Sequence, residues 1–193
     1  TSDPNTSQSA ENILSSTAKA GNVQALDFFV LYYLNYGASS FINHNDNNEK
    51  VLNAFVVRKN ELLEAVVNDS QGSRARAISM LRNLANKNLA IDVLGEAVLS
   101  VDDWQLDNDF ERLLKEGRAE AVSFFVENLK KILMVADGRN YRRKGFVLSL
   151  IQIAADLDQQ PLVQSKAIHA LGELSISMDT TEMAMCFTKF LER

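Results

Sequence analysis

The stretch from Ser73 to Leu84, SRARAISMLRNL, decides the fold class. Apolar residues recur in it at spacings of three and four, which places them on one face of an α-helix. These residues are Ala77, Ile78, Leu81 and Leu84. A small residue followed by larger apolar ones lets such a helix approach a neighbour closely and still fill the space between them.

This pattern recurs along the chain. Ala121 follows Ala77 by 44 residues, and Ala167 follows Ala121 by 46 residues. A weaker copy begins at Ala25, where the asparagine-rich loop predicted over 39–48 accounts for a longer spacing. Periods of about 40–47 residues are typical of arrays of paired helices. We therefore expect an all-α fold of antiparallel helical pairs stacked as a short α-solenoid, with an irregular helical bundle as the alternative.

The rest of the chain also predicts helices and no strand. It contains only 8 Gly and 2 Pro, whereas all-β folds use many of both in turns. Asn22 is a candidate N-cap, and Gly37 is a candidate stop for the helix between them. The predicted helices cover 11–20, 22–36, 49–67, 73–84, 89–99, 102–117, 118–135, 140–157, 162–176 and 183–191.

Composition predicts a soluble protein with one domain. Residues 1–10 are polar and predict a disordered lead-in, followed by a single repeat domain over 11–193. No apolar run approaches the roughly 18 residues needed to span a membrane. The single cysteine, Cys186, excludes an intramolecular disulfide but leaves the compartment open. A cytoplasmic location is slightly favoured, with an exported or lumenal form as the alternative.

The last copy of the pattern resembles a HEAT repeat. The order of its residues is that of the family's second helix and preceding turn, although Gln164 stands where the family has arginine. In the copy around Ala77, Asp69 and Arg74 also fit, whereas Gly117 and Arg118 replace the turn aspartate of the next copy. The matching residues of the last copy are Asp158, Pro161, Val163, Ala167, Leu171, Gly172 and Leu174.

This resemblance to HEAT and armadillo repeats covers residues 49–177 and implies where partners bind. In that family the second helices often line a concave surface. The positions off the apolar face of those helices become candidate partner-binding residues by this resemblance alone. They are Arg76, Met80, Asn83 and Gln164.

No catalytic or cofactor motif is present. The two histidines, His44 and His169, lie far apart in the sequence, and there is no second cysteine for zinc. We expect no cofactor, no metal site and no enzymatic activity. The alternative is an enzyme whose carboxylates meet in a groove without a recognisable motif. The carboxylates considered for that groove are Glu61, Glu64, Asp92 and Glu96.

The charge of the chain indicates which kinds of partner it binds. The net charge of -5 and the pI of about 5.1 disfavour nucleic acid, because phosphate-binding proteins are usually basic. Two local patches favour a protein or peptide instead. One is the aromatic row Phe28, Tyr32 and Tyr36 at spacings of four, since aromatic residues often anchor interfaces. The other is the basic group Arg142, Arg143 and Lys144, which suits an acidic segment.

These observations together favour a protein–protein interaction module, such as an adaptor, scaffold or regulatory subunit, that binds on an extended helical surface. A self-associating structural subunit is a further alternative, with the aromatic helix as the interface of a homo-oligomer.

Overall fold

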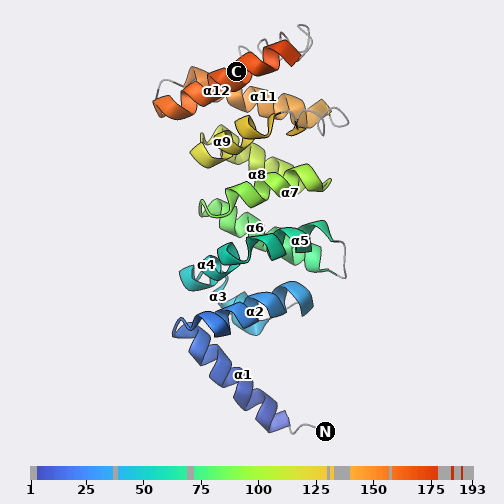
Figure 1. The fold of residues 1–193 in the computed structure, drawn as a ribbon, viewed down its shortest axis with the longest axis vertical. Coiled ribbons are helices and arrows are strands. Elements are labelled where there is room, and N and C mark those ends of the chain that lie inside the picture. The colour runs from blue at the N-terminus through green and yellow to red at the C-terminus, as the bar shows by residue number, and fades with distance from the viewer. Residues whose placement is uncertain are drawn as a thin grey trace. The chain divides into compact units, whose positions relative to one another are not determined.

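A computed structural model describes residues 4–36, 39–68, 72–129, 131–132, 140–156 and 158–177, together with residues 184 and 188. Every regular element in these residues is a helix (Figure 1), which confirms the prediction of an all-α chain. None of the described helices has the length and apolar character needed to cross a membrane. The predicted helix over 183–191 lies largely outside the described residues.

The chain divides into two compact units, Thr1–Val93 and Leu94–Arg193, where the sequence predicted a single domain. In the first unit α2 is central, because α1, α3, α4, α5 and α6 all contact it. The helices of this unit are α1 (Pro4–Lys19), α2 (Val23–Tyr36), α3 (Ser40–Asn45), α4 (Glu49–Val57), α5 (Lys59–Val67) and α6 (Ser73–Asn86), and α7 (Ile91–Ser100) begins there.

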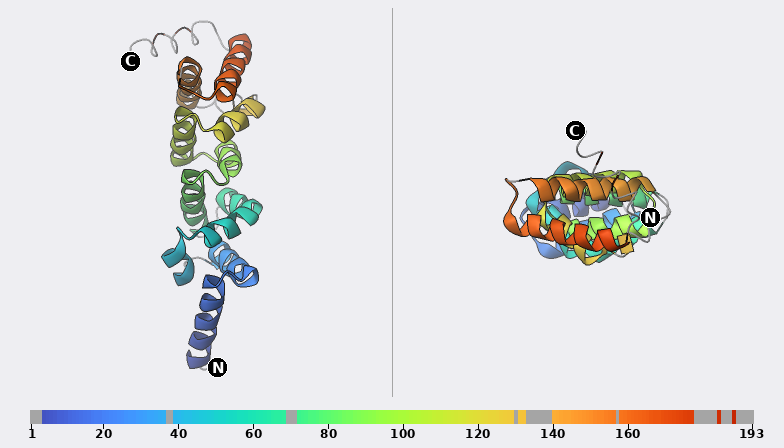
Figure 2. Two further views of the ribbon diagram at one scale, coloured as in Figure 1. Left: turned by 90° about the vertical axis from the view of Figure 1, so that its left-hand side faces the viewer. Right: turned by 90° about the horizontal axis from the view of Figure 1, so that it is seen from above.

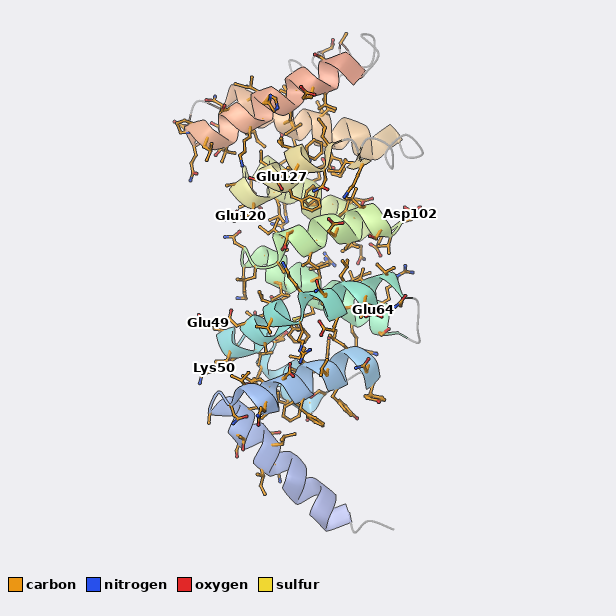
Figure 3. All side chains as sticks on the ribbon, viewed as in Figure 1. Glu49, Lys50, Glu64, Asp102, Glu120 and Glu127 are labelled. Atoms are coloured by element: carbon orange, nitrogen blue, oxygen red, sulfur yellow. The ribbon has the colours of Figure 1, made fainter. Side chains whose placement is uncertain are left out.

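Local capping starts several of these helices. The predicted cap Asn22 accepts a hydrogen bond from the backbone N–H of Ala25 at 3.0 Å and so begins α2. Asn48 caps α4 in the same way, through the N–H of Lys50. The Lys50 ammonium reaches back to the α1–α2 turn and donates to the carbonyl of Ala20 at 3.2 Å (Figure 3). This bond ties α4 to the start of α2.

Three boundaries in the first unit differ from those that the sequence predicts. Helix α1 begins at Pro4, although residues 1–10 were predicted to be a disordered lead-in; proline suits the first turn of a helix. The predicted loop 39–48 contains α3, which Ser39 caps through the N–H of Ile42. The single helix predicted over 49–67 divides into α4 and α5 at Arg58, whose backbone leaves helical geometry at φ −100° and ψ 33°.

The second unit contains α8 (Trp104–Lys115), α9 (Ala119–Glu127), α11 (Asn140–Ala155) and α12 (Pro161–Ser177), besides the rest of α7. Helices α11 and α12 lie side by side (Figure 2), and they contact α8 and α9 respectively. Phe146 of α11 meets Phe110 and Phe125 edge-on, with ring centroids 5.8 and 5.7 Å apart. These rings form the centre of the core in this unit.

The small residues of the sequence pattern are all buried. Ala77, Ala121 and Ala167 are each inaccessible to solvent, as expected for positions where helices approach closely. Ile168 differs, because it is exposed although the pattern placed it on the packed face. Gly95 of α7 lies close to α9, because an added Cβ would lie 2.3 Å from the ring of Phe124.

Candidate partner-binding surface

Helix α2 has two aromatic rows, and only one of them is in the core. Phe29 stacks on Phe41 of α3 with ring centroids 4.4 Å apart. Tyr33 meets Phe55 of α4 edge-on at 5.7 Å. All four side chains are buried. This row therefore holds α2, α3 and α4 together, and its residues are not available to a partner.

The second row is on the surface. Phe28, Tyr32 and Tyr36 are 51%, 43% and 79% exposed, so these three side chains do not belong to the core. Their rings follow one another along the helix, with centroids 6.1 Å apart for Phe28–Tyr32 and 5.4 Å apart for Tyr32–Tyr36. We call these three residues the aromatic stripe. A contiguous exposed apolar patch of this kind is typical of a binding site.

An ion-pair network fixes α2 on the side of α4 and α5. The Arg58 guanidinium donates to both carboxylate oxygens of Asp27 at 2.6 Å and to Glu61 at 2.7 Å. The hydrogen bonds from Arg58 hold the pKa values of Asp27 and Glu61 below their ordinary range and raise the pKa of Arg58 itself. The only carboxylate in α2 is therefore engaged within the unit.

A polar cavity of about 290 Å³ lies among α2, α3 and α6. Asn83 and Met80, both predicted as partner-binding residues, line it together with Asp46. The Asn83 amide donates to the backbone carbonyl of Asp46 at 2.9 Å and so joins α6 to the end of α3. Burial raises the pKa of Tyr33, which also lines this cavity. The remaining lining residues are Ile42, Asn43, Asn47 and Ser79.

The resemblance implies that Arg76, Met80 and Asn83 of α6 lie on an open surface, but each of them is buried or half-buried. Met80 is only 3% exposed, because it packs into the first unit. Arg76 is half-buried, and its Nε atom is enclosed without a hydrogen-bond partner. Asn83 is half-buried and already bonded to Asp46. Met80, which the resemblance predicts to contact a partner, is buried and lines the same cavity as Ile42 of α3.

Gln164 is a structural residue in the second unit. Its side-chain amide donates to the carbonyls of Ala154 and Asp156, at 3.0 and 3.2 Å. These carbonyls lie at the C-terminal end of α11 and just beyond it. The last carbonyls of a helix have no hydrogen-bond donor within the helix, so they need a donor from elsewhere. Gln164, which the resemblance predicts to contact a partner, is half-buried and closes the end of the neighbouring helix through these two hydrogen bonds.

The predicted basic patch lies in the first two turns of α11. The side chains of Arg142, Arg143 and Lys144 lie outside the described residues. The next residue, Gly145, lies against the carboxylate of Glu111, which an added Cβ would meet at 2.5 Å. That carboxylate binds Lys115 at 2.5 Å, one helical turn further along α8.

The four carboxylates considered for an enzymatic groove have different surroundings. Asp92 pairs with Lys59 at 2.7 Å, and Glu61 belongs to the Arg58 network. Glu61 and Glu64 line a cavity of about 180 Å³ between α2, α5 and α6. Figure 3 labels Glu64 on α5. The lowered pKa of Glu61 is opposite to the shift that a general acid requires. Glu96 lies on α7, in the other unit.

In the part of the chain that the structure describes, no group of three or more His, Cys, Asp or Glu residues is arranged for a metal ion.

The sequence missed two features of the surface. The side chains of Asn43, Asp46 and Asn47 line a cavity, whereas their composition predicted only a loop; their clustering beside the cap Ser39 was the available signal. Trp104 is 63% exposed at the start of α8, where Asp103 caps the helix. The only indication of this exposure in the sequence was the position of Trp104 directly after the cap residue Asp103.

Comparison with known proteins adds no relative. No protein-family model, no curated protein and no solved structure matches this chain.

Proposed function

We propose that this chain is a protein–protein interaction module that holds a protein or peptide against the aromatic stripe of α2. The observation that carries the proposal is the exposure of Phe28, Tyr32 and Tyr36, which follow one another on one face of one helix. Tyrosine and phenylalanine are enriched in interfaces because they offer a large contact area at a small cost in side-chain entropy.

The scaffold suits this role. The opposite row of α2 is buried against α3 and α4, and Arg58 binds Asp27 in a bidentate pair, so the helix that presents the stripe is held on several sides. A rigid helix loses little further entropy when it binds a partner. The stripe is therefore preorganised rather than formed on binding.

We further propose that the helices belong to a stacked array of the HEAT and armadillo type. The burial of Ala77, Ala121 and Ala167 at a spacing of 44 and 46 residues supports this architecture. Such arrays leave extended surfaces open to partners. The basic group at Arg142, Arg143 and Lys144 is the candidate for a second contact, with an acidic segment.

Affinity capture with matched variants tests the proposal. The native chain, Tyr32→Ala/Tyr36→Ala and Arg142→Glu/Arg143→Glu are used as bait, with Trp104→Ala as a control for an exposed aromatic side chain elsewhere. We expect a specific protein that the native chain and Trp104→Ala retain and that the tyrosine variant loses. If every bait retains the same proteins, the stripe is not a binding surface.

The same exposed stripe supports a second candidate, a self-associating subunit. In that case the mass measured by light scattering rises with protein concentration, and Tyr32→Ala/Tyr36→Ala keeps the chain monomeric. A native chain that stays monomeric over the whole range contradicts this candidate.

A further inference from the structure

The sequence around the aromatic stripe lacks charge. From Ala20 to Asn45 the only Asp, Glu, Lys or Arg residue is Asp27, although 23% of the chain is charged. Asp27 is itself bonded to Arg58. The exposed neighbours of the stripe on α2 include Gln24 and Asn35, which are neutral. Depletion of charged residues together with aromatic enrichment is the composition of an interface core, which favours an occupant whose contacting side is also uncharged.

The spacing of the rings matches the repeat of side chains along a second helix. The centroid separations of 6.1 and 5.4 Å are close to the rise of four residues in an α-helix, about 6.0 Å. Rows of side chains four residues apart on two helices can therefore interdigitate along the whole stripe. A polyproline II segment presents the same face only every three residues, about 9.3 Å. An extended strand on this surface would leave its backbone groups without partners, because α2 offers no sheet edge.

The size of the stripe distinguishes a short segment from a second copy of the chain. An aromatic side chain contributes about 200 Å² of surface, so the exposed fractions of the three rings correspond to about 350 Å². A stable complex between two folded proteins buries about 800 Å² on each partner. The stripe supplies less than half of that area, and each copy also carries a net charge of -5.

We propose that the occupant is an amphipathic helix of a partner protein, whose uncharged aliphatic row at i, i+4 and i+8 lies along Phe28, Tyr32 and Tyr36. This inference rests on the proposed function and adds the chemistry and conformation of the partner. The phenol hydroxyls of Tyr32 and Tyr36 remain at the edge of the contact, where they stay hydrated or bond to polar groups that flank the aliphatic row.

Peptide selection with counter-selection tests the inference. A displayed library of random peptides, long enough for about four helical turns, is selected on the full native chain. Binders that also bind Tyr32→Ala/Tyr36→Ala are removed. The affinity of the survivors is then measured by fluorescence anisotropy, and their conformation by circular dichroism. Both tyrosines are exposed, so the variant is expected to keep the native unfolding midpoint, which is checked first.

The expected survivors carry uncharged aliphatic residues at helical spacing and become helical on binding. Their affinity should fall about tenfold or more with Tyr36→Ala and stay unchanged with Trp104→Ala, which lies in the other unit. Survivors that are proline-rich or that alternate apolar and polar residues overturn the helical occupant but leave the proposed function standing. A library without any stripe-dependent binder overturns both. If the native chain dimerises and the tyrosine variant does not, the occupant is a second copy and the inference is wrong.

Discussion

Replacing Gly95 with alanine should destabilise the second unit, although alanine is the better helix former. The gain in intrinsic helix propensity is about 1 kcal/mol. Against it, the new Cβ would lie 2.3, 2.4 and 2.6 Å from three ring atoms of Phe124, whereas carbon atoms prefer separations of about 3.5–4.0 Å. The ring of Phe124 is buried and packs edge-on against Phe110 with centroids 5.8 Å apart, so it cannot swing away freely.

Overpacking of this kind costs about 1–3 kcal/mol. Because the overlap is about 1 Å at three ring atoms, we take the upper part of that range. After subtraction of the helix-propensity gain, the free energy of unfolding should fall by about 1–2 kcal/mol. Urea unfolding followed by circular dichroism measures this change.

Two other glycines in the same unit supply controls. Gly172 of α12 has nothing within 4 Å of an added Cβ, so Gly172→Ala should stabilise the unit by about 0.5–1 kcal/mol. At Gly145 the obstacle is the flexible carboxylate of Glu111, so Gly145→Ala should lie between these limits. If Gly95→Ala and Gly172→Ala stabilise equally, α7 does not approach Phe124 as described. A double variant Gly95→Ala/Phe124→Leu should recover part of the loss, because the smaller side chain removes the overlap.

Three further outcomes follow from the contacts. The lowered pKa values of Asp27 and Glu61 contribute stability above the ordinary carboxyl range of about 4, and this stability is lost as the pH falls through the folded-state values. Thermal unfolding from pH 7 to pH 3 should therefore depend less on pH in Arg58→Gln than in the native chain; identical profiles would contradict the network. Met80→Ala should lower the free energy of unfolding by about 2–5 kcal/mol, as for a buried methionine, and a change below about 0.5 kcal/mol would place Met80 on the surface. Gln164→Ala should cost about 1 kcal/mol in urea unfolding and leave partner capture unchanged, whereas lost capture from a chain of native stability would restore its predicted binding role.

The candidate site was predictable in part. The spacing of Phe28, Tyr32 and Tyr36 was visible in the sequence, and so was their difference from the row of Phe29 and Tyr33. The exposure of the first row was not, because both rows are equally apolar and either could have faced the core. The position of α3 against α2 decides the matter, since Phe41 stacks on Phe29.

The residues inferred from the family resemblance make contacts that the resemblance does not predict. Met80 and Asn83 do line the same cavity, but the methionine is buried and the asparagine is bonded to the carbonyl of Asp46. Gln164 closes the end of α11. A consensus position carries no information about these contacts, because the partner group lies 37 residues away for Asn83 and belongs to another helix for Gln164.

The sequence by itself determined that this chain is helical and where most helices begin. Periodicity and capping are local: Asn22 and Asn48 act on residues two or three positions ahead, so the sequence contains both the cap and its target. Only the tertiary structure shows that the helix predicted over 49–67 divides at Arg58 and that the aromatic stripe is exposed to solvent. Both results depend on contacts between residues far apart in the sequence, Arg58 with Asp27 and Phe41 with Phe29. A local pattern cannot specify such contacts, because they form only when the helices have packed.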